Sequence, residues 1–383
     1  MQRKERLSKE IKAEAERLGF NFCGICEVHP PLHVEIFSSW ISEGMAADLE
    51  YLKRNEVLKT RSHPEKVLQK GKSVIVVGMH YSPVVKTEDN SDKSASGRIA
   101  SYALHEDYHE IFRRRIRQFT IWLKDESSEN VKFRVLVDSS AVPEKELAYF
   151  AGLGWIGRNS LLIHPTFGSF CLLGAIFTTL EIEPDSPLEG DICANCRACI
   201  DACPTGAINA NRTVDARKCI SYHTIENKGI VPKDLRERIS NRVFGCDTCQ
   251  IVCPANKGII NNNPQPSSLM QAVPPQVNPF HVLRLDQKAF DEEYGGTPLD
   301  RISLDLFQRN MVLAVGNIGS ESQIGLLEKI LDNHPSDLVR AHAAWAIGQI
   351  GSPKSKRILL KCLRQEANQI VRKEIASAQE KID

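Results

Sequence analysis

The sequence contains no long apolar segment. None of its apolar runs approaches the roughly 18 residues that a membrane-spanning helix requires. The N-terminal stretch MQRKERLSKEIKAEAERLGF alternates charged and small apolar residues, so it lacks the apolar core of a secretory signal, and no twin-arginine pair precedes such a core. With 42% hydrophobic and 25% charged residues, the composition is that of an ordinary globular protein. We therefore expect a cytoplasmic protein that makes no use of a membrane.

An excess of either charge is also absent. Lys and Arg total 49 against 48 for Asp and Glu, so the overall charge gives no indication of a nucleic-acid partner. Basic residues do gather locally at Arg113, Arg114, Arg115 and Arg117. On charge alone, a solvated helix face explains this cluster better than a binding patch does.

Cysteine, by contrast, is concentrated in one short segment. Eight of the 12 cysteines lie between residues 191 and 256. One run has the spacing C-x2-C-x2-C-x3-C and a later run has the spacing C-x2-C-x3-C, each followed by proline, with a single cysteine between them. In chain order these residues are Cys193, Cys196, Cys199, Cys203, Pro204, Cys219, Cys246, Cys249, Cys253 and Pro254.

This spacing is typical of two 4Fe–4S clusters. A cubane cluster needs four thiolates aimed at one centre, and short steps let a single turning backbone supply three of them. In two-cluster ferredoxins the fourth cysteine of such a run ligates the other cluster. We therefore assign Cys193, Cys196, Cys199 and Cys253 to one cluster, and Cys203, Cys219, Cys246 and Cys249 to the other.

Zinc and disulfides are the other uses of clustered cysteines. Zinc ribbons use two C-x2-C pairs separated by a spacer, rather than three cysteines at x2 followed by x3-Cys-Pro. A disulfide framework requires an oxidising compartment, of which the sequence gives no sign. The spacing therefore favours iron–sulfur clusters, which transfer single electrons.

The other four cysteines are predicted to bind no iron. Cys23 and Cys26 form a C-x2-C pair, but strand alternation points their thiols to opposite faces, so we interpret them as small buried side chains. Cys171 and Cys362 stand alone in the sequence.

The first 182 residues predict a domain that mixes helices and strands. Apolar periodicity predicts helices over residues 2–18, 102–123 and 144–150, the second entered through HEDYH. Alternating or β-branched runs predict strands over residues 20–27, 72–80, 133–137 and 169–182.

Asp138 is the first candidate for chemistry. It directly follows the strand FRVLV, and α/β folds place their chemistry at the carboxyl ends of strands. Ser139 and Ser140 can hydrogen-bond its carboxylate. The alternative role is an N-cap for the helix that begins at Glu144, and the sequence alone favours neither role.

A glycine-rich turn, with Gly152, Gly154 and Gly157, ends in Asn159 and Ser160. It follows a helix rather than a strand, so it is not a usual dinucleotide-binding loop. It indicates that the backbone approaches either a partner segment or a ligand closely.

The composition changes after residue 256. Residues 257–300 are rich in Asn, Pro and Gln, which predicts an extended connector packed on the surface. From Leu306 the chain becomes helical, and VGNIGS at 315–320 recurs 32 residues later as IGQIGS at 347–352. This period predicts an α-solenoid of the HEAT type, which usually presents a surface to a macromolecule; a stabilising buttress is the alternative.

Several of these stretches together resemble the epoxyqueuosine reductase family of the tRNA queuosine pathway. Two departures are local: His105 and Glu106 stand where glycine is expected before DYH, and Ala255 stands where tryptophan is common. Neither departure removes one of the eight clustered cysteines or Asp138. The resembling segments are EDYH (106–109), VDSSAVPEKELA (137–148), AGLGWIGRNSLLI (151–163), CISYHTIENKG (219–229) and FGCDTCQIVCPAN (244–256).

The resemblance implies a cobalamin cofactor held between the N-terminal domain and the cluster module. It further implies that cobalt reduced by the clusters donates electrons to the epoxide of epoxyqueuosine at the wobble position of tRNA. The epoxide opens to the alkene with loss of water, and Asp138 is the implied proton donor. The implied cobalamin contacts are Arg61, Asp138, Asn159, Ser160, Ser169, Ser221, Tyr222 and Asp247.

We therefore expect an α+β multidomain protein. Its expected parts are an α/β cobalamin-binding and catalytic domain (1–182), a two-cluster ferredoxin-like domain (183–262), a connector (263–305) and HEAT-like repeats (306–383). The expected partners are the anticodon stem-loop of tRNA and an external electron donor such as a flavodoxin or ferredoxin system, and we expect a monomer. Within the repeats, the residues expected to help bind the anticodon arm are Arg340, Lys354, Lys356 and Arg357.

Two other functional classes stay open. A reductive dehalogenase would also join cobalamin to two such clusters, although those proteins look exported and this sequence has no export signal. A simple electron carrier fused to a helical scaffold would need neither Asp138 nor the glycine-rich turn. Bound cobalamin would separate the carrier from the enzymes, and the substrate would separate the enzymes from each other.

Overall fold

The chain consists of two compact units that each draw on three chain segments. The computed structural model describes residues 2–84, 96–127, 130–138, 142–261 and 269–382. The first unit comprises Met1–Val85, Glu106–Arg217 and Thr248–Met270. The second comprises Lys86–His105, Lys218–Asp247 and Gln271–Asp383.

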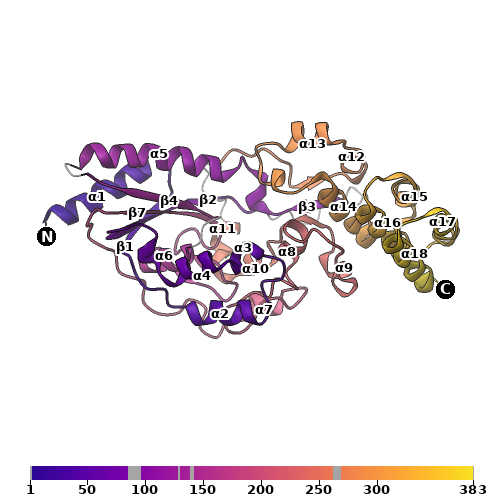
Figure 1. Ribbon diagram of the computed structural model, residues 1–383, viewed down its shortest axis with the longest axis horizontal. Helices are drawn as coiled ribbons and strands as arrows, with labels where there is room; N and C mark the ends of the chain where they lie inside the picture. The colour runs from indigo at the N-terminus through magenta and orange to yellow at the C-terminus, as the bar shows by residue number, and fades with distance from the viewer. Residues whose placement is uncertain (1, 85–95, 128–129, 139–141, 262–268, 383) are drawn as a thin grey trace. The chain divides into compact units, whose positions relative to one another are not determined.

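A four-stranded sheet forms the centre of the first unit (Figure 1). Every neighbouring pair in it is antiparallel, and the strands agree with those that the apolar patterns predicted. The strand that reads SVIVVGMH is buried at every position. In spatial order the strands are β1 (Phe22–Glu27), β2 (Ser73–His80), β7 (Cys171–Thr178) and β4 (Phe133–Val137).

Helices cover both faces of this sheet (Figure 1). On one face α1 (Gln2–Arg17) packs against β1 and α5 (Tyr108–Glu126) packs against β4. On the other face α6 (Glu144–Phe150) closes an apolar core with Val74, Leu147 and Phe177. The fold is therefore a mixed α+β arrangement, and α1 and α6 lie where the sequence predicted them.

The start of α5 differs from the prediction. The helix begins at Tyr108 and not at Tyr102, because Asp107 caps it: its side chain accepts a hydrogen bond from the backbone N–H of His109 at 2.9 Å. Residues Ser101–Leu104 form a separate short turn, η2. The cap therefore sets the positions of the first residues of α5.

Between β1 and β2 the chain forms short helices that no prediction covered. Their contacts are made by partly buried side chains: Trp40 donates from Nε1 to the carbonyl of Val214 at 2.8 Å, and the guanidinium of Arg61 lies 4.7 Å from the centre of the Phe37 ring. These elements are α2 (Val34–Ser42), α3 (Glu50–Lys53), α4 (Asn55–Ser62) and η1 (Pro64–Lys66).

The glycine-rich turn is explained by close contact within the chain. Gly152 and Gly154 have φ of +70° and +159°. A β-carbon on Gly152 would lie 2.6 Å from the carbonyl oxygen of Ser186, and one on Gly154 would lie 2.4 Å from that of Ile163. The close neighbour of this backbone is therefore another segment of the chain. The turn leads into the hairpin of β5 (Trp155–Ile156) and β6 (Leu162–Ile163).

The cysteine-rich part of the first unit has only short helices. α7 packs against α10, so the first cysteine run lies beside the part of the second run that contains Cys249. Cys253 is the N-cap residue of the turn η3, whose first residue is Pro254. The helices are α7 (Ala198–Asp201), α10 (Thr248–Ile251), η3 (Pro254–Asn256) and α11 (Lys257–Asn261).

The second unit contains a small sheet of three short strands. β3 (Gly97–Ile99) lies in the middle, parallel to β8 (Arg242–Phe244) and antiparallel to β9 (Gln276–Val277). The helices α8 (Ile220–Ile225) and α9 (Lys233–Ile239) belong to the same unit, and α8 packs against β8.

The prediction of an extended connector is wrong for residues 276–301. Val282, Phe290 and Tyr294 are buried there, in short helices. The polar residues and prolines that suggested a connector instead start these helices, since Asn278, Asp286 and Thr297 are side-chain N-caps. The elements are α12 (Pro279–Val282), α13 (Gln287–Tyr294) and η4 (Pro298–Arg301).

The predicted repeats form the C-terminal helices (Figure 1). α14 and α18 both pack against α16, while α15 and α17 contact α16 and each other. Val339 and Val371, which lie one repeat apart in the sequence, are both fully buried. The elements are α14 (Leu304–Ile318), η5 (Glu321–Gln323), α15 (Ile324–Asn333), α16 (Asp337–Ile350), α17 (Pro353–Gln365) and α18 (Gln369–Ile382).

A buried polar brace joins α14 to the segment around α8. Arg309 and Asn310 are both fully buried. Arg309 donates to the carbonyl oxygens of His223 at 2.5 Å and Asn227 at 2.6 Å, and Asn310 donates to that of Thr224 at 2.8 Å. These bonds supply hydrogen-bond donors to backbone carbonyl groups in the interior of the unit.

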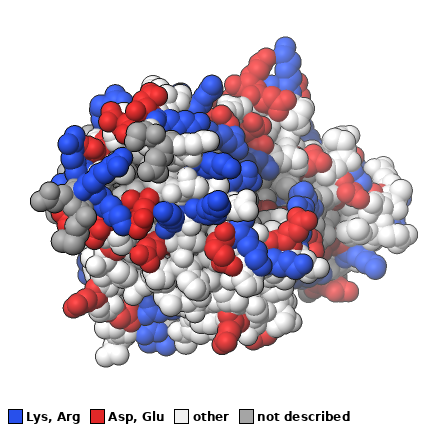
Figure 2. Space-filling view, turned by 60° about the vertical axis from the view of Figure 1, so that its left-hand side comes forward, with Lys and Arg blue, Asp and Glu red and all other residues white. Residues whose placement is uncertain are grey.

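The arginines of α5 form a solvated helix face. Arg113, Arg114 and Arg117 are exposed, and Arg113 pairs with Glu110. Arg115 points inward and donates to the carbonyl of Gly19 at 2.6 Å. Figure 2 shows basic and acidic side chains interspersed on one face of the molecule. Among the described residues, no helix combines the length and the apolar character needed to cross a bilayer.

Candidate active site

Asp138 stands at the end of β4 and meets two side chains from the start of α5. Tyr108 donates its hydroxyl to Oδ2 of Asp138 at 2.7 Å, and Nε2 of His109 lies 3.2 Å from the same oxygen. Nδ1 of His109 lies 2.7 Å from Oδ1 of Asp107. The His109 ring therefore joins two carboxylates. Ser139 and Ser140, which were expected to hydrogen-bond Asp138, lie outside the described residues.

Asp138 is both strained and open. Its φ of +50° lies in the left-handed region, which costs a non-glycine residue roughly 1 kcal/mol. Its side chain is 44% exposed, whereas that of His109 is 8% exposed. The alternative role as a helix cap is not observed, because the N-cap residue of α6 is Pro143 and no side chain caps that helix. A strained, exposed carboxyl held by buried partners is typical of a functional position.

The two carboxylates set the charge of His109. Burial alone would lower the pKa of the imidazole, but the hydrogen bonds and charges of Asp107 and Asp138 raise it to about 9. His109 is therefore an imidazolium at neutral pH. The rings of Tyr108 and His109 stack with centroids 4.2 Å apart, so neither donor is free to swing away.

Lys145 and Arg61 bring positive charge to the same part of the unit. The pKa of Lys145 is lowered, first by the packed atoms around it and then by the charge of Arg61, while Glu144 and Asp138 act in the opposite direction. Lys145 is nevertheless exposed to solvent. Its ammonium donates to the carbonyl of Ser160 at 2.6 Å.

The four thiols assigned to the first cluster lie in one unit, and their charges affect the pKa values of Cys199 and Cys253. Burial raises the pKa of Cys199, and the charges of Cys193 and Cys253 raise it further. Burial likewise raises the pKa of Cys253, with added contributions from Cys193 and Cys196. Cys253 comes from the second run, so its place beside the first run is what the crossover assignment requires.

The thiols assigned to the second cluster are divided between the two units. Cys203 and Cys249 lie in the first unit, and the backbone N–H of Ala207 donates to Sγ of Cys203 at 3.3 Å. Cys219 and Cys246 lie in the second unit, where Cys219 is the N-cap residue of α8 and Cys246 closely follows β8. This ligand set stays a prediction.

The remaining cysteines are in surroundings that keep them protonated. Burial raises the pKa of Cys23 and of Cys26 to about 12, and it raises the pKa of Cys171 as well. The pKa of Cys362 is raised to about 12 by burial and by Asp332, which accepts its S–H at 3.0 Å. Only thiolates bind metals well, so these four residues are poor ligands.

Single-ion sites were sought separately. Within the described ranges, no three His, Cys, Asp or Glu side chains converge on a position for one metal ion. A cubane cluster binds its four thiolates through four different iron atoms, so its ligands stand farther apart than those of a single ion.

The predicted cofactor contacts of the first unit differ in burial and in whether their polar atoms already have hydrogen-bond partners. Nε of Arg61 is buried and has no hydrogen-bond partner among the described residues. Ser160 has a left-handed φ of +61° and donates to the carbonyl of Arg212. Asn159 and Ser169 are buried, and Ser169 is held by Gln250 at 3.1 Å and Asn256 at 2.9 Å. The side chain of Ser169 therefore serves the fold.

The predicted contacts of the second unit are Ser221, Tyr222 and Asp247. Ser221 is partly exposed on α8, whereas Tyr222 is buried. Oδ2 of Asp247 accepts a hydrogen bond from the backbone N–H of Ser101 at 2.7 Å. The structure thus leaves Ser221 more accessible than its neighbour.

Three residues of the site were missed as functional residues: Asp107, Tyr108 and His109. They belong to the segment EDYH, which carried the family resemblance, but no role was attached to them. Their contact with Asp138 joins positions about 30 residues apart, so no local pattern indicates it. The motif itself was the signal that could have pointed to them.

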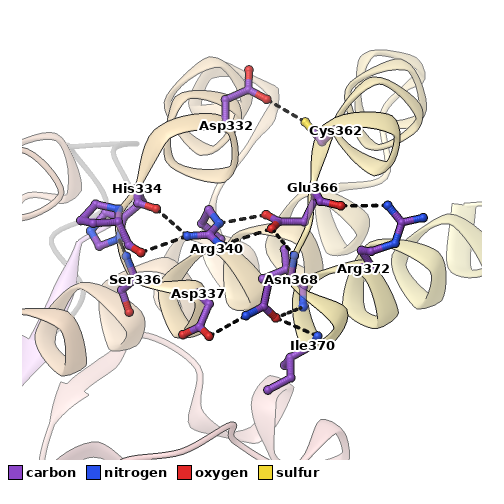
Figure 3. A network of polar contacts seen from close by, with 12 residues as sticks. Asp332, His334, Ser336, Asp337, Arg340, Cys362, Glu366, Asn368, Ile370 and Arg372 are labelled. Carbon is purple, nitrogen blue, oxygen red and sulfur yellow. Dashed lines mark hydrogen bonds and ion pairs between the residues drawn. The ribbon is translucent and has the colours of Figure 1, made fainter.

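Arg340, expected to bind RNA, is committed within the repeats (Figure 3). Its guanidinium pairs with Glu366 at 2.9 Å and donates to the carbonyl of His334 at 2.8 Å. We therefore remove it from the expected RNA contacts. Lys354, Lys356 and Arg357, at the start of α17, are exposed.

Comparison with protein families identifies three matching regions. The model described as "4Fe-4S double cluster binding domain" matches residues 192–256. The model described as "Epoxyqueuosine reductase QueG, DUF1730" matches residues 61–139, and the HEAT repeat model matches residues 304–379.

Relatives and solved structures cover most of the chain. An epoxyqueuosine reductase of Francisella cf. novicida is 37% identical over 295 residues, which is 74% of this chain and 80% of the relative. The structure of epoxyqueuosine reductase from Streptococcus thermophilus matches with a TM-score of 0.89 and 27% identity, covering 98% of this chain and 99% of that one. A crystal structure of epoxyqueuosine reductase with an epoxyqueuosine-modified tRNA-Tyr stem loop matches with a TM-score of 0.87, 27% identity and the same coverage.

Proposed function

Because the chain belongs to the epoxyqueuosine reductase family, we propose that it reduces the epoxide of epoxyqueuosine at the wobble position of tRNA to the alkene of queuosine. The observation that carries this proposal is Asp138, an open carboxyl held by Tyr108 and His109 in the same unit as four thiols with cluster spacing. Opening an epoxide to an alkene breaks two C–O bonds, consumes two electrons and two protons, and releases water. The site therefore has to supply both electrons and protons.

The double-cluster domain would supply the electrons. One 4Fe–4S cluster would be held by Cys193, Cys196, Cys199 and Cys253, and the other by Cys203, Cys219, Cys246 and Cys249. When bound, each cluster supplies one electron at a time. An external donor of the flavodoxin or ferredoxin type would provide these electrons.

The first unit fits a large polar cofactor, and cobalamin is the one that we propose. Its residues offer a buried Nε on Arg61 that has no hydrogen-bond partner among the described residues, and the exposed ammonium of Lys145, which interacts with Asp138. Within this unit Arg61, Asn159 and Ser160 would hold the group. When bound, cobalamin supplies a low-potential metal centre for two-electron reduction.

The role of Asp138 is proton donation. An alkoxide is a poor leaving group unless it is protonated, so a positioned acid is needed, and such an acid typically contributes about 10²–10⁴-fold. Tyr108 fixes the carboxyl from the side by its bond to Oδ2. The positive charges of Lys145 and Arg61, in the same unit, favour the approach of an anionic RNA.

A tRNA substrate requires a surface that binds RNA. The basic start of α17 (Lys354, Lys356 and Arg357) is the surface that we propose for the anticodon stem-loop. A tRNA substrate places the enzyme in the cytoplasm, and we propose that it acts as a monomer.

The test is anaerobic reconstitution of the full chain with iron, sulfide and a cobalamin, followed by reaction with an epoxyqueuosine-containing tRNA stem-loop under a low-potential reductant. Conversion to queuosine, read by mass spectrometry of the nucleosides, is expected. Cluster absorption without cobalamin binding would reduce the protein to an electron carrier. Turnover of an organohalide but not of the tRNA would make it a dehalogenase.

A further inference from the structure

The reaction needs two protons, and Asp138 carries only one. The second has to reach the same place within the same turnover, after the epoxide ring has opened. Bulk water is a poor source at neutral pH, where free protons are scarce. A protonated group in contact with Asp138 would solve this requirement.

His109 is such a group. Its Nε2 lies 3.2 Å from Oδ2 of Asp138, and its Nδ1 lies 2.7 Å from Oδ1 of Asp107. The ring is buried and stacked on Tyr108, so it cannot turn to exchange these partners. A histidine between two carboxylates holds its proton well. The proton passes toward Asp138, whose carboxyl is exposed, because Asp107 is on the other side of the ring and caps α5.

We propose that His109 supplies the second proton of each turnover through Asp138, with Asp107 keeping the imidazole charged between turnovers. This inference rests on the proposed function. Asp138 is ionised beside the charged imidazole, so it first takes up a proton from solvent as the substrate binds. As a carboxylic acid it then protonates the epoxide oxygen while the ring opens. The resulting carboxylate takes the proton from Nε2 of His109 and delivers it to the hydroxyl that leaves as water. The cycle ends with neutral His109 and ionised Asp138, and solvent returns two protons.

The charges around the pair agree with this direction. The carboxylates that face His109 are Asp107, from the start of its own helix, and Asp138, from the end of β4. The cation that interacts with Asp138 is Lys145 from α6, and Arg61 from the end of α4 acts on Lys145. The charge of Lys145 favours the carboxylate that Asp138 becomes after it gives up its proton, and the adjacent imidazolium then restores that proton. His109 acts through Asp138 and needs no contact with the substrate.

The sign of the pH dependence follows from the raised pKa of His109, about 9. The imidazolium is present below this pH and is lost as the pH rises through it. The single-turnover rate of epoxide reduction by the holoenzyme should therefore be flat near neutrality and fall above about pH 9. Asp107→Asn removes one of the two carboxylates, so it should move this alkaline limb down by about one pH unit.

The decisive comparison measures this rate from pH 6 to pH 10 in His109→Gln, Asp107→Asn and the wild type. His109→Gln should lose about 10²-fold at neutral pH and show no alkaline limb near pH 9. His164→Gln, a change at another histidine of the same unit, should keep both the rate and the limb. Iron content and far-ultraviolet circular dichroism of each variant check that the fold and the clusters are retained.

A second measurement does not depend on turnover. In the holoenzyme with oxidised clusters and labelled histidine, one imidazole resonance should titrate near pH 9, be missing in His109→Gln and titrate at lower pH in Asp107→Asn. An unchanged titration in Asp107→Asn would overturn the relay. So would an equal rate loss at every pH in His109→Gln with the limb in place, which is the behaviour of a structural side chain. If the wild type does not reduce the tRNA at all, the proposed function fails instead.

Discussion

Two groups of polar side chains in this protein differ in what surrounds them. The group in the first unit, Asp107, His109 and Asp138, ends in a side chain that is 44% exposed and sits on a strained backbone. The group in the second unit, Arg309 and Asn310, is fully buried, and its donors meet backbone carbonyls. The first group exposes the carboxyl of Asp138 to solvent, whereas the second group exposes no polar atom.

The difference separates polar residues that do chemistry from polar residues that hold the fold. A saturated buried group resists change because each lost bond leaves an orphaned partner. Substitution of an exposed polar group changes the free energy of unfolding little, but it removes the reaction that the group carries out. The same contrast recurs between Arg340, which is paired inside the repeats (Figure 3), and the exposed basic residues of α17.

The sharpest way to test the contrast is Asp138→Asn. The amide keeps the size of the side chain and can still accept from Tyr108, but it cannot deliver a carboxylic proton. Epoxide reduction should fall by about 10²–10⁴-fold, while iron content and the midpoint of chemical unfolding stay at wild-type values. A wild-type rate with cofactors intact would place the acid elsewhere.

The opposite result is expected for Arg309→Met. Removing the guanidinium orphans the carbonyl oxygens of His223 and Asn227 in the buried brace. The free energy of unfolding, measured by denaturant titration of the full chain, should fall by about 3 kcal/mol. Arg357→Met, on the exposed start of α17, is the matched control and should change it by less than about 0.5 kcal/mol. Equal effects would remove the distinction.

The cysteines allow the same comparison by iron content. Cys196→Ser should cost about four iron atoms per chain, because one cluster of the two loses a ligand. Cys26→Ser should cost none, since burial raises the pKa of that thiol to about 12 and leaves no thiolate to bind iron. Iron loss in the Cys26 variant would contradict the assignment.

The smallest effect concerns RNA binding. Replacing Lys354, Lys356 and Arg357 together by Gln should weaken binding of the stem-loop modestly and lower the slope of log affinity against log salt by about two. Arg340→Gln should leave that slope unchanged, because its charge is spent on Glu366. Filter binding at several salt concentrations measures both. An unchanged slope in the triple variant would reduce the repeats to a buttress.

Local patterns were enough for much of this structure. The strands β1, β2 and β4 follow from apolar runs, and Cys253 beside the first cysteine run follows from spacing. The sequence could not indicate that His109 meets Asp138, since that contact joins the start of a helix to the end of a strand. It also could not tell that Arg340 is paired, because Glu366 lies at the end of the following helix, α17.

Composition misled where the same residues serve two purposes. Richness in Asn, Pro and Gln suggested a connector, yet short helices begin at the caps Asn278, Asp286 and Thr297, and each buries an aromatic or aliphatic side chain. Polar caps and surface loops draw on the same residue types. Only the buried residues between them, such as Phe290, distinguish the two cases.

The order of strands in the central sheet has a consequence for synthesis on the ribosome. β2 pairs with β1 on one edge and with β7 on the other, and roughly ninety residues separate β2 from β7 in the chain. At about 5–20 residues per second, an apolar strand edge therefore waits for about 5–20 s before its partner emerges. Throughout that interval the nascent chain displays SVIVVGMH with one edge unpaired, which makes this strand the segment most in need of chaperone protection.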